Sequence, residues 1–146
     1  MVKRLSVLAV SALLPAAPAS PAFGGVVSPV EDCGSVGTPR QVRVSGHEGV
    51  PPVEMQVGKD TRFEFDFTPS RDQPNAEFTM VAETAVGEIP VEQHTMVKLA
   101  TGKTYTVRHT VRPTDLLAGQ QMKIRAKVTG GNRTEMCVKI LVNVRA

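Results

Sequence analysis

One stretch of six residues, 62–67 (RFEFDF), constrains the fold more than any other part of this chain. Aromatic and charged residues alternate in it without interruption. Successive side chains of a β-strand point to opposite faces, so a strand here would turn its aromatic residues to one side and its charges to the other. The pattern predicts a half-buried strand with Phe63, Phe65 and Phe67 in a core, and with its charged residues, Glu64 and Asp66 among them, in water.

The same alternation of apolar and polar residues recurs along most of the chain, and no long amphipathic helix is visible. Turn-forming residues separate the short stretches, at 68–70, 72–75, 102–103 and 130–132, and the last of these is the strongest hairpin signal. A chain of 146 residues has the usual size of one domain. The pattern therefore predicts a single all-β domain, either an antiparallel sandwich or a barrel.

The N-terminus has the features of a secretory signal peptide, which we expect to span residues 1–22. Lys3 and Arg4 precede an apolar run, and small residues then lead to two suitable cleavage sites, after Ala19 and after Ala22, of which we favour the second. Loss of the leader lowers the formal net charge by two, from +3 to +1. The mature chain, 23–146, then lacks the basic surface that nucleic-acid binding requires.

Two cysteines, Cys33 and Cys137, remain in a chain that is routed to an oxidising compartment. In that setting a disulfide is a better interpretation than a pair of reactive thiols or metal ligands. Closing a loop of about 100 residues stabilises a fold by about 4 to 5 kcal/mol in the chain-entropy model. We expect the bridge to join the first strand region to the last.

Residues that would carry catalysis or bind a metal are not grouped in this sequence. The three histidines, His47, His94 and His109, fall in separate segments, and no nucleophile has a recognisable base beside it. We therefore expect no enzyme activity, no metal and no cofactor. Asn132 opens an Asn-Arg-Thr sequon at the predicted hairpin tip, and it is either a glycosylation site or simply a turn former.

The phenylalanine-rich face has two interpretations. On pattern alone it is an ordinary packed core. Alternatively, two sheets that splay apart would leave a slot lined by Phe, Met and Val, which suits a sterol or an acyl chain because such walls make contact without requiring hydrogen bonds. Periodicity does not distinguish a filled core from a hollow one.

Several short segments together resemble the ML-domain family of lipid-recognition proteins, which includes the Niemann-Pick type C secreted sterol carrier and the mite group 2 allergens. The segment 30–36 (VEDCGSV) is similar to the start of the mature family members, 102–105 (GKTY) to a strand start, and 136–138 (MCV) to the late cysteine before the last strand. The segment 87–91 (GEIPV) is similar to a glycine and proline-valine segment. The resemblance spans residues 30–145.

The resemblance implies an immunoglobulin-like β-sandwich of two antiparallel sheets, without catalysis, that carries a sterol, a fatty acid or a related lipid between the sheets. It implies a secreted protein, extracellular or in the lysosomal lumen, with transient contact to a membrane or a receptor. We expect a monomer without a nucleic-acid partner. A lipid-sensing co-receptor of innate immunity and a solid-core adhesive module are the alternatives. The implied lipid-lining residues are Phe63, Phe65, Phe67, Phe78, Met80, Tyr105, Val107, Val138, Ile140 and Val142.

Overall fold

The computed structural model describes residues 14–15 and 24–146, with the backbone alone at 14–15 and 93–97. The predicted signal peptide thus lies outside the described residues except for the backbone of Leu14–Pro15. Those two residues form the short strand β1, which pairs antiparallel with β9 (Tyr105–Val111) and places Pro15 opposite Tyr105. No helix among the described residues is long and apolar enough to span a membrane.

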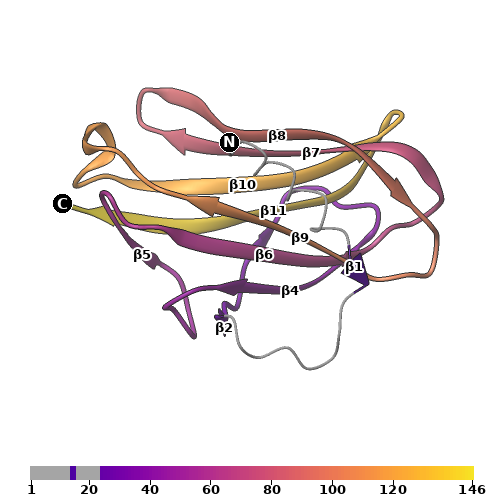
Figure 1. Ribbon diagram of the computed structural model, residues 1–146, viewed down its shortest axis with the longest axis horizontal. Coiled ribbons are helices and arrows are strands. Elements are labelled where there is room, and N and C mark those ends of the chain that lie inside the picture. Colours follow the sequence, from indigo (N-terminus) through magenta and orange to yellow (C-terminus); the bar gives the residue numbers. More distant parts are fainter. Residues whose placement is uncertain (1–13, 16–23) are drawn as a thin grey trace, which may run out of the picture.

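The described chain is built almost entirely from strands, which form two sheets packed face to face (Figure 1). This confirms the all-β class and the immunoglobulin-like β-sandwich. The first sheet has the order β1-β9-β6-β4-β2. Its members are β1 (Leu14–Pro15), β2 (Gly25–Val26), β4 (Thr38–Val44), β6 (Thr61–Thr68) and β9 (Tyr105–Val111).

The second sheet has the order β3-β11-β10-β7-β8, and β5 also pairs with β11. Its members are β3 (Glu31–Asp32), β5 (Val53–Gln56), β7 (Gln73–Thr84), β8 (Gly87–Leu99), β10 (Gln121–Gly130) and β11 (Arg133–Arg145). A single 3-10 turn, η2 (Asp115–Leu117), interrupts the described strands between β9 and β10. The pairings between long strands are antiparallel, whereas β5 runs parallel to the end of β11.

The predicted turns are right at 130–132 and only partly right at 72–75. Gly131 and Asn132 connect β10 to β11, and Asn132 is exposed at the tip. Pro74 and Asn75, by contrast, already belong to β7. The ladder is irregular there, with a register shift between Gln73 and Ala76, and such an irregularity accommodates a proline that has no N–H to donate.

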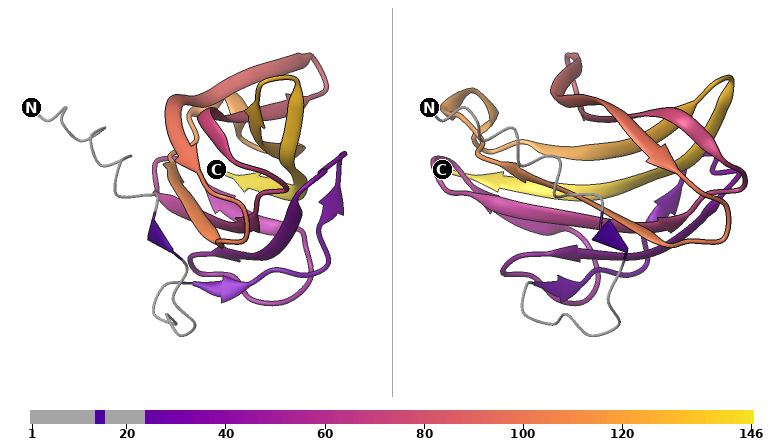
Figure 2. Two further views of the ribbon diagram at one scale, coloured as in Figure 1. Left: turned by 90° about the vertical axis from the view of Figure 1, so that its right-hand side faces the viewer. Right: turned by 45° about the vertical axis from the view of Figure 1, so that its right-hand side comes forward.

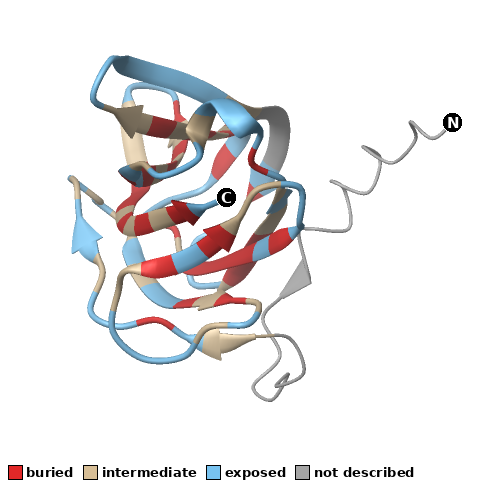
Figure 3. Ribbon diagram, turned by 90° about the vertical axis from the view of Figure 1, so that its left-hand side faces the viewer, coloured by how far each residue is buried: buried red, intermediate tan, exposed pale blue. Residues whose placement is uncertain are grey.

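The core lies between the two sheets and is made by the inward-facing residues of both (Figure 3). The strand β6 follows its predicted alternation on this side, since all three of its phenylalanines are fully buried. The opposite face of β6 departs from the prediction. Glu64 and Asp66 are also buried, so the expectation that they lie in water is wrong.

The reason for this burial is Arg43 on the neighbouring strand β4. Its guanidinium donates two hydrogen bonds to the Asp66 carboxylate, at 2.7 and 2.8 Å, and one to Glu64 at 2.9 Å. Asp66 also accepts a bond of 2.7 Å from the hydroxyl of Thr106 on β9. A carboxylate with this many charged and neutral donors no longer needs water.

Candidate functional site

All ten residues that the resemblance implies as lipid-lining are buried in one continuous core. They come from four strands, β6 and β9 of the first sheet and β7 and β11 of the second, and Tyr105 lies at the start of β9. Their facing is therefore as predicted. Contact with a lipid stays a prediction, because burial alone is equally a property of a packed core.

Aromatic contacts define how close the sheets come. Phe65 of β6 and Phe78 of β7 belong to different sheets, and their ring centroids lie 6.2 Å apart. Phe67 and Tyr105 are paired neighbours on β6 and β9, with centroids 6.1 Å apart. Aromatic pairs at 4.5 to 7 Å are in contact, so the two sheets touch directly at the Phe65–Phe78 position.

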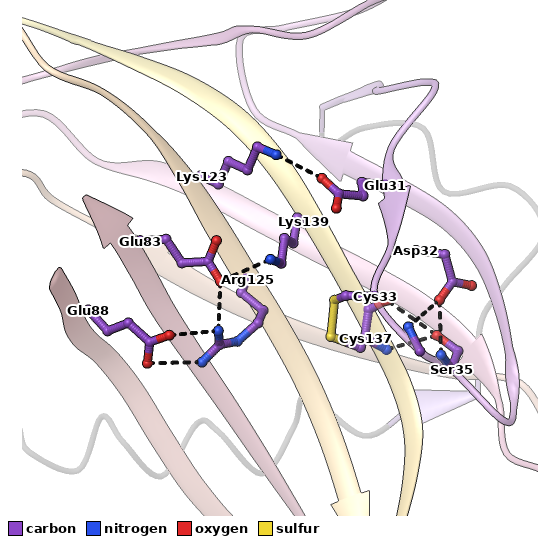
Figure 4. Close-up of a disulfide and its surroundings, with 11 residues drawn as sticks. Glu31, Asp32, Cys33, Ser35, Glu83, Glu88, Lys123, Arg125, Cys137 and Lys139 are labelled. Carbon is purple, nitrogen blue, oxygen red and sulfur yellow. Dashed lines mark hydrogen bonds and ion pairs between the residues drawn. A yellow bond between two sulfur atoms is a disulfide. The ribbon is translucent and has the colours of Figure 1, made fainter. Parts of the chain in front are cut away.

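The sandwich has two long seams where the edges of the sheets meet, and they differ. At the first seam, the chain between β3 and β4 bonds to the start of β11: Val36 donates from its backbone N–H to Thr134, and Gly37 to Glu135, at 2.9 and 3.0 Å. The same seam carries the disulfide between Cys33 and Cys137 (Figure 4), whose Cα atoms lie 5.0 Å apart. The predicted bridge is confirmed.

The second seam runs between β8 and β9, which are consecutive in sequence but lie in different sheets (Figure 2). Across it, the imidazole of His109 on β9 lies 3.5 Å from the carboxylate of Glu92 on β8. Where the two strands join, the hydroxyl of Tyr105 accepts a 2.8 Å hydrogen bond from the backbone N–H of Ala100. No backbone ladder connects the described residues of β8 and β9.

A pocket of about 510 Å³ opens at the joined end of this second seam. The buried side chains of Leu99 and Tyr105 belong both to its wall and to the core. The rest of the lining is Asp72, Pro74, Lys98, Ala100 and Lys103. Sequence reasoning did not identify this pocket, because its walls come from the starts of β7 and β9 and the end of β8, which only the folded pairing brings together.

A second pocket, of about 520 Å³, lies on the outer face of the second sheet. Its walls include Pro29, Val50 and Leu141, and its rim carries Lys123 and Lys139. Both lysines are already paired, as Figure 4 shows: Lys123 with Glu31 at 3.0 Å and Lys139 with Glu83 at 3.1 Å. The charges of this outer face satisfy one another.

The carboxyl groups near the outer pocket have lowered pKa values, as their hydrogen-bond and ion-pair partners dictate. A hydrogen bond and the positive charge of Lys123 lower the pKa of Glu31. Backbone N–H donors of Ser35 and Gly34 lower the pKa of Asp32 in the turn that follows β3. The hydrogen bond from Arg125 lowers the pKa of Glu88. These carboxylates are ionised, which is typical of a solvated sheet face and not of an acid catalyst.

No group of three or more His, Cys, Asp or Glu side chains that could hold a metal ion occurs among the described residues. The imidazole of His47 lies 3.0 Å from the carbonyl oxygen of Val50. His109 takes part in the seam contact described above, and the side chain of His94 lies outside the described residues.

Comparison with known proteins finds likeness in structure and none in sequence. No protein-family model matches the chain, and no curated protein matches its sequence. Among solved structures, a Niemann-Pick type C2 protein from the Japanese carpenter ant superposes with a TM-score of 0.66 at 17% identity, over 80% of this chain and 99% of that one. This likeness supports an ML-like fold.

Two further structures share the sandwich more loosely. The C-terminal domain of Wzt gives a TM-score of 0.58 at 14% identity, over 84% of this chain and 82% of that one. A CARDB domain from Pyrococcus furiosus, solved with di-metal ions, gives 0.51 at 15% identity, over 78% and 94%. At such identities the likeness concerns the fold alone, and function has to be argued from the site.

Proposed function

We propose that this protein is a secreted lipid-binding protein that holds a sterol, a fatty acid or a related lipid between its two sheets. The observation that carries the proposal is the apolar layer formed by the facing strands β6, β9, β7 and β11, in a fold matched over four fifths of the chain by a Niemann-Pick type C2 protein. The proposal involves no catalysis and treats the protein as a monomer without a nucleic-acid partner.

The second seam supplies the route of entry in this proposal. Contacts between side chains are easier to separate here than a ladder of backbone hydrogen bonds. His109 and Glu92 are partly exposed, so water can take the place of each partner at little cost in free energy. The core holds Met80, Met122 and Met136, and methionine adapts to new shapes more readily than branched residues. A lipid that enters here would displace the Phe65–Phe78 contact.

Secretion is supported by the disulfide, which persists in oxidising compartments. Within such a compartment, the proposal allows transient contact with a membrane or a receptor. Val86 and Leu116 suit that contact because they are 88% and 84% exposed. They follow β7 and β9 at the end of the sandwich opposite the pocket of Leu99 and Tyr105.

A solid-core adhesive module is the second candidate, and the Phe65–Phe78 contact favours it. Sheets that touch at their centre leave no room there for cargo. The two candidates differ in one respect that can be measured: a carrier separates the rings when lipid is supplied, whereas a solid core does not.

Native mass spectrometry of the purified protein, followed by organic extraction and lipid identification, tests the proposal. We expect a sterol or an acyl lipid at a stoichiometry of one. A Phe78→Ala variant removes one ring of the contact between the sheets and leaves a cavity that costs about 3 to 5 kcal/mol in the empty protein. Added lipid should restore more of the melting temperature in this variant than in the wild type, because it fills the cavity.

The matched control is Val144→Ala, which makes a smaller cavity at the end of β11, away from the contact. We expect added lipid to raise its melting temperature no more than that of the wild type. The carrier would be excluded, and the solid-core module left, by two results together. The purified wild type would carry no lipid, and neither it nor Phe78→Ala would show a melting shift with any added sterol or fatty acid.

A further inference from the structure

The pocket at the joined end of the second seam combines an apolar wall with two lysines. Lys98 is the penultimate residue of β8, and Lys103 lies in the loop before β9; both are exposed, and both line the same pocket as Leu99 and Tyr105. Neither lysine has a carboxylate within ion-pair distance among the described residues. This differs from Lys123 and Lys139 at the outer pocket.

One carboxylate, that of Asp72, shares the pocket, and it already has a role in the loop. Its Oδ1 accepts a 2.7 Å hydrogen bond from the backbone N–H of Thr101, which fixes the turn between Lys98 and Lys103. Two ammonium groups against one carboxylate leave the pocket with a net positive charge. The positive charge lies where the apolar core meets water.

We infer that this pocket binds the anionic headgroup of a single-chain amphipathic lipid, such as a long-chain carboxylate, whose tail enters along the second seam. The inference rests on the proposed function, because it names the class of lipid that the same core would take. Unpaired lysines attract an anion, while Leu99 and Tyr105 are placed to contact the first carbons of its tail. A pocket of about 510 Å³ is within the usual range for a small-molecule site.

A sterol fits this pocket less well. Its single hydroxyl carries no charge, so it gains less from the two ammonium groups than a carboxylate does. The Tyr105 hydroxyl accepts the N–H of Ala100 and keeps its own O–H to donate to a lipid of either class. The charge of the pocket thus separates two lipid classes that the apolar core alone would accept equally.

The test compares dodecanoate with 1-dodecanol, which share a tail and differ in the charge of the head. Isothermal titration calorimetry near pH 8 measures both affinities in low and in high salt. We expect the wild type to bind dodecanoate about fivefold to tenfold more tightly than the alcohol in low salt, with the preference reduced in high salt. Acetate should not compete, because the tail supplies most of the binding free energy.

Three variants locate the preference. Lys98→Gln/Lys103→Gln should bind dodecanoate and dodecanol with equal affinity, while its affinity for dodecanol stays that of the wild type. Asp72→Asn keeps the acceptor for Thr101 and removes the competing charge, so it should increase the preference about twofold to threefold. Lys59→Gln, exposed in the turn before β6 at the other end of the sandwich, should leave it unchanged.

The outcomes separate this inference from the proposal on which it rests. Equal binding of both lipids by the wild type, or a preference that survives in the double lysine variant, overturns the headgroup site and leaves the lipid carrier intact. If acetate, which has the carboxylate but no tail, competes with dodecanoate, the pocket is a simple anion site and the lipid-headgroup inference is overturned. Failure of both lipids to bind overturns the headgroup site. The proposed function falls with it only if the purified protein also carries no lipid and shows no melting shift with added sterol or fatty acid.

Discussion

Glu135 is the most deeply buried charged residue described in the structure, and its replacement by glutamine should destabilise the fold markedly. Its side chain is 0% exposed. One carboxylate oxygen accepts the backbone N–H of Ser70 at 2.7 Å, and the other accepts the Ser70 hydroxyl at 3.1 Å and the Gln73 amide at 2.8 Å. These bonds join the start of β11 to the turn between β6 and β7.

The magnitude follows from the two bonds that Glu135→Gln disturbs. The new amide nitrogen replaces the oxygen that accepts from Ser70 and Gln73, whereas the remaining oxygen still accepts the Ser70 N–H. A hydrogen bond to a charged group contributes about 1.5 to 3 kcal/mol, and reorientation of the Ser70 hydroxyl and the Gln73 amide recovers part of the loss. We expect the free energy of unfolding to fall by about 2 to 3 kcal/mol.

The pH dependence of the free energy of unfolding is a second, independent test of the role of Glu135. Burial by itself raises the pKa of Glu135, but the hydrogen bonds from Ser70 and Gln73 outweigh it, so the pKa is lowered from its ordinary value of 4.5. A carboxyl whose pKa is lower in the folded state stabilises the fold above its unfolded pKa, and that contribution disappears as the pH falls through the folded value. The difference in the free energy of unfolding between the wild type and Glu135→Gln should therefore decrease as the pH is lowered.

Urea unfolding followed by circular dichroism at pH values between about 3 and 7 measures both effects. A loss of 2 to 3 kcal/mol is equivalent to a midpoint shift of about 1 to 2 M urea. Glu135→Asn, which is too short to reach Ser70, serves as the reference for complete loss of the bonds. A Glu135→Gln variant as stable as the wild type at neutral pH, or a difference that stays constant down to pH 3, would refute the reasoning.

Two further predictions concern stability. Replacing Cys33 and Cys137 by serine should lower the free energy of unfolding by about 3 to 5 kcal/mol, because a bridge over 104 residues restricts the unfolded chain; urea unfolding with and without reductant checks this, and a loss below about 1 kcal/mol would contradict it. Arg43→Met should cost about 3 to 5 kcal/mol, because it leaves the buried carboxylates of Glu64 and Asp66 without their main cation, and Asp66→Asn in the same background should recover part of the loss in thermal unfolding.

The inner faces of both sheets could be predicted from the sequence because strand periodicity is a local signal. Two residues decide the facing of a whole strand, so Phe63 and Phe65 are enough to orient β6. The hairpin at Gly131 is equally local, since its positive φ of 59° suits glycine at that turn. The disulfide was predictable for another reason: two cysteines allow one pairing only.

The buried charges could not be predicted in the same way, because their partners are distant in sequence. Arg43 lies 21 residues before Glu64, and Ser70 lies 65 residues before Glu135. A charge that alternates with phenylalanine is expected in water unless a specific donor covers it, and the local pattern contains no sign of that donor. The parallel pairing of β5 with β11 depends on the same long-range information.

The two seams have opposite properties, and this asymmetry bears on how a sandwich with touching sheets could take up a lipid. At the first seam, the disulfide, the backbone bonds of Val36 and Gly37, and the bonds of Glu135 all fix β11 against neighbouring chain. At the second, a solvent-accessible pair, His109 with Glu92, joins strands that share no backbone ladder in the described chain. Strands that share no backbone ladder separate at a lower cost than strands joined by buried backbone hydrogen bonds. In the proposed carrier, the sheets would therefore part along β8 and β9 and pivot about β11, which brings the lipid first to the pocket that Lys98 and Lys103 flank.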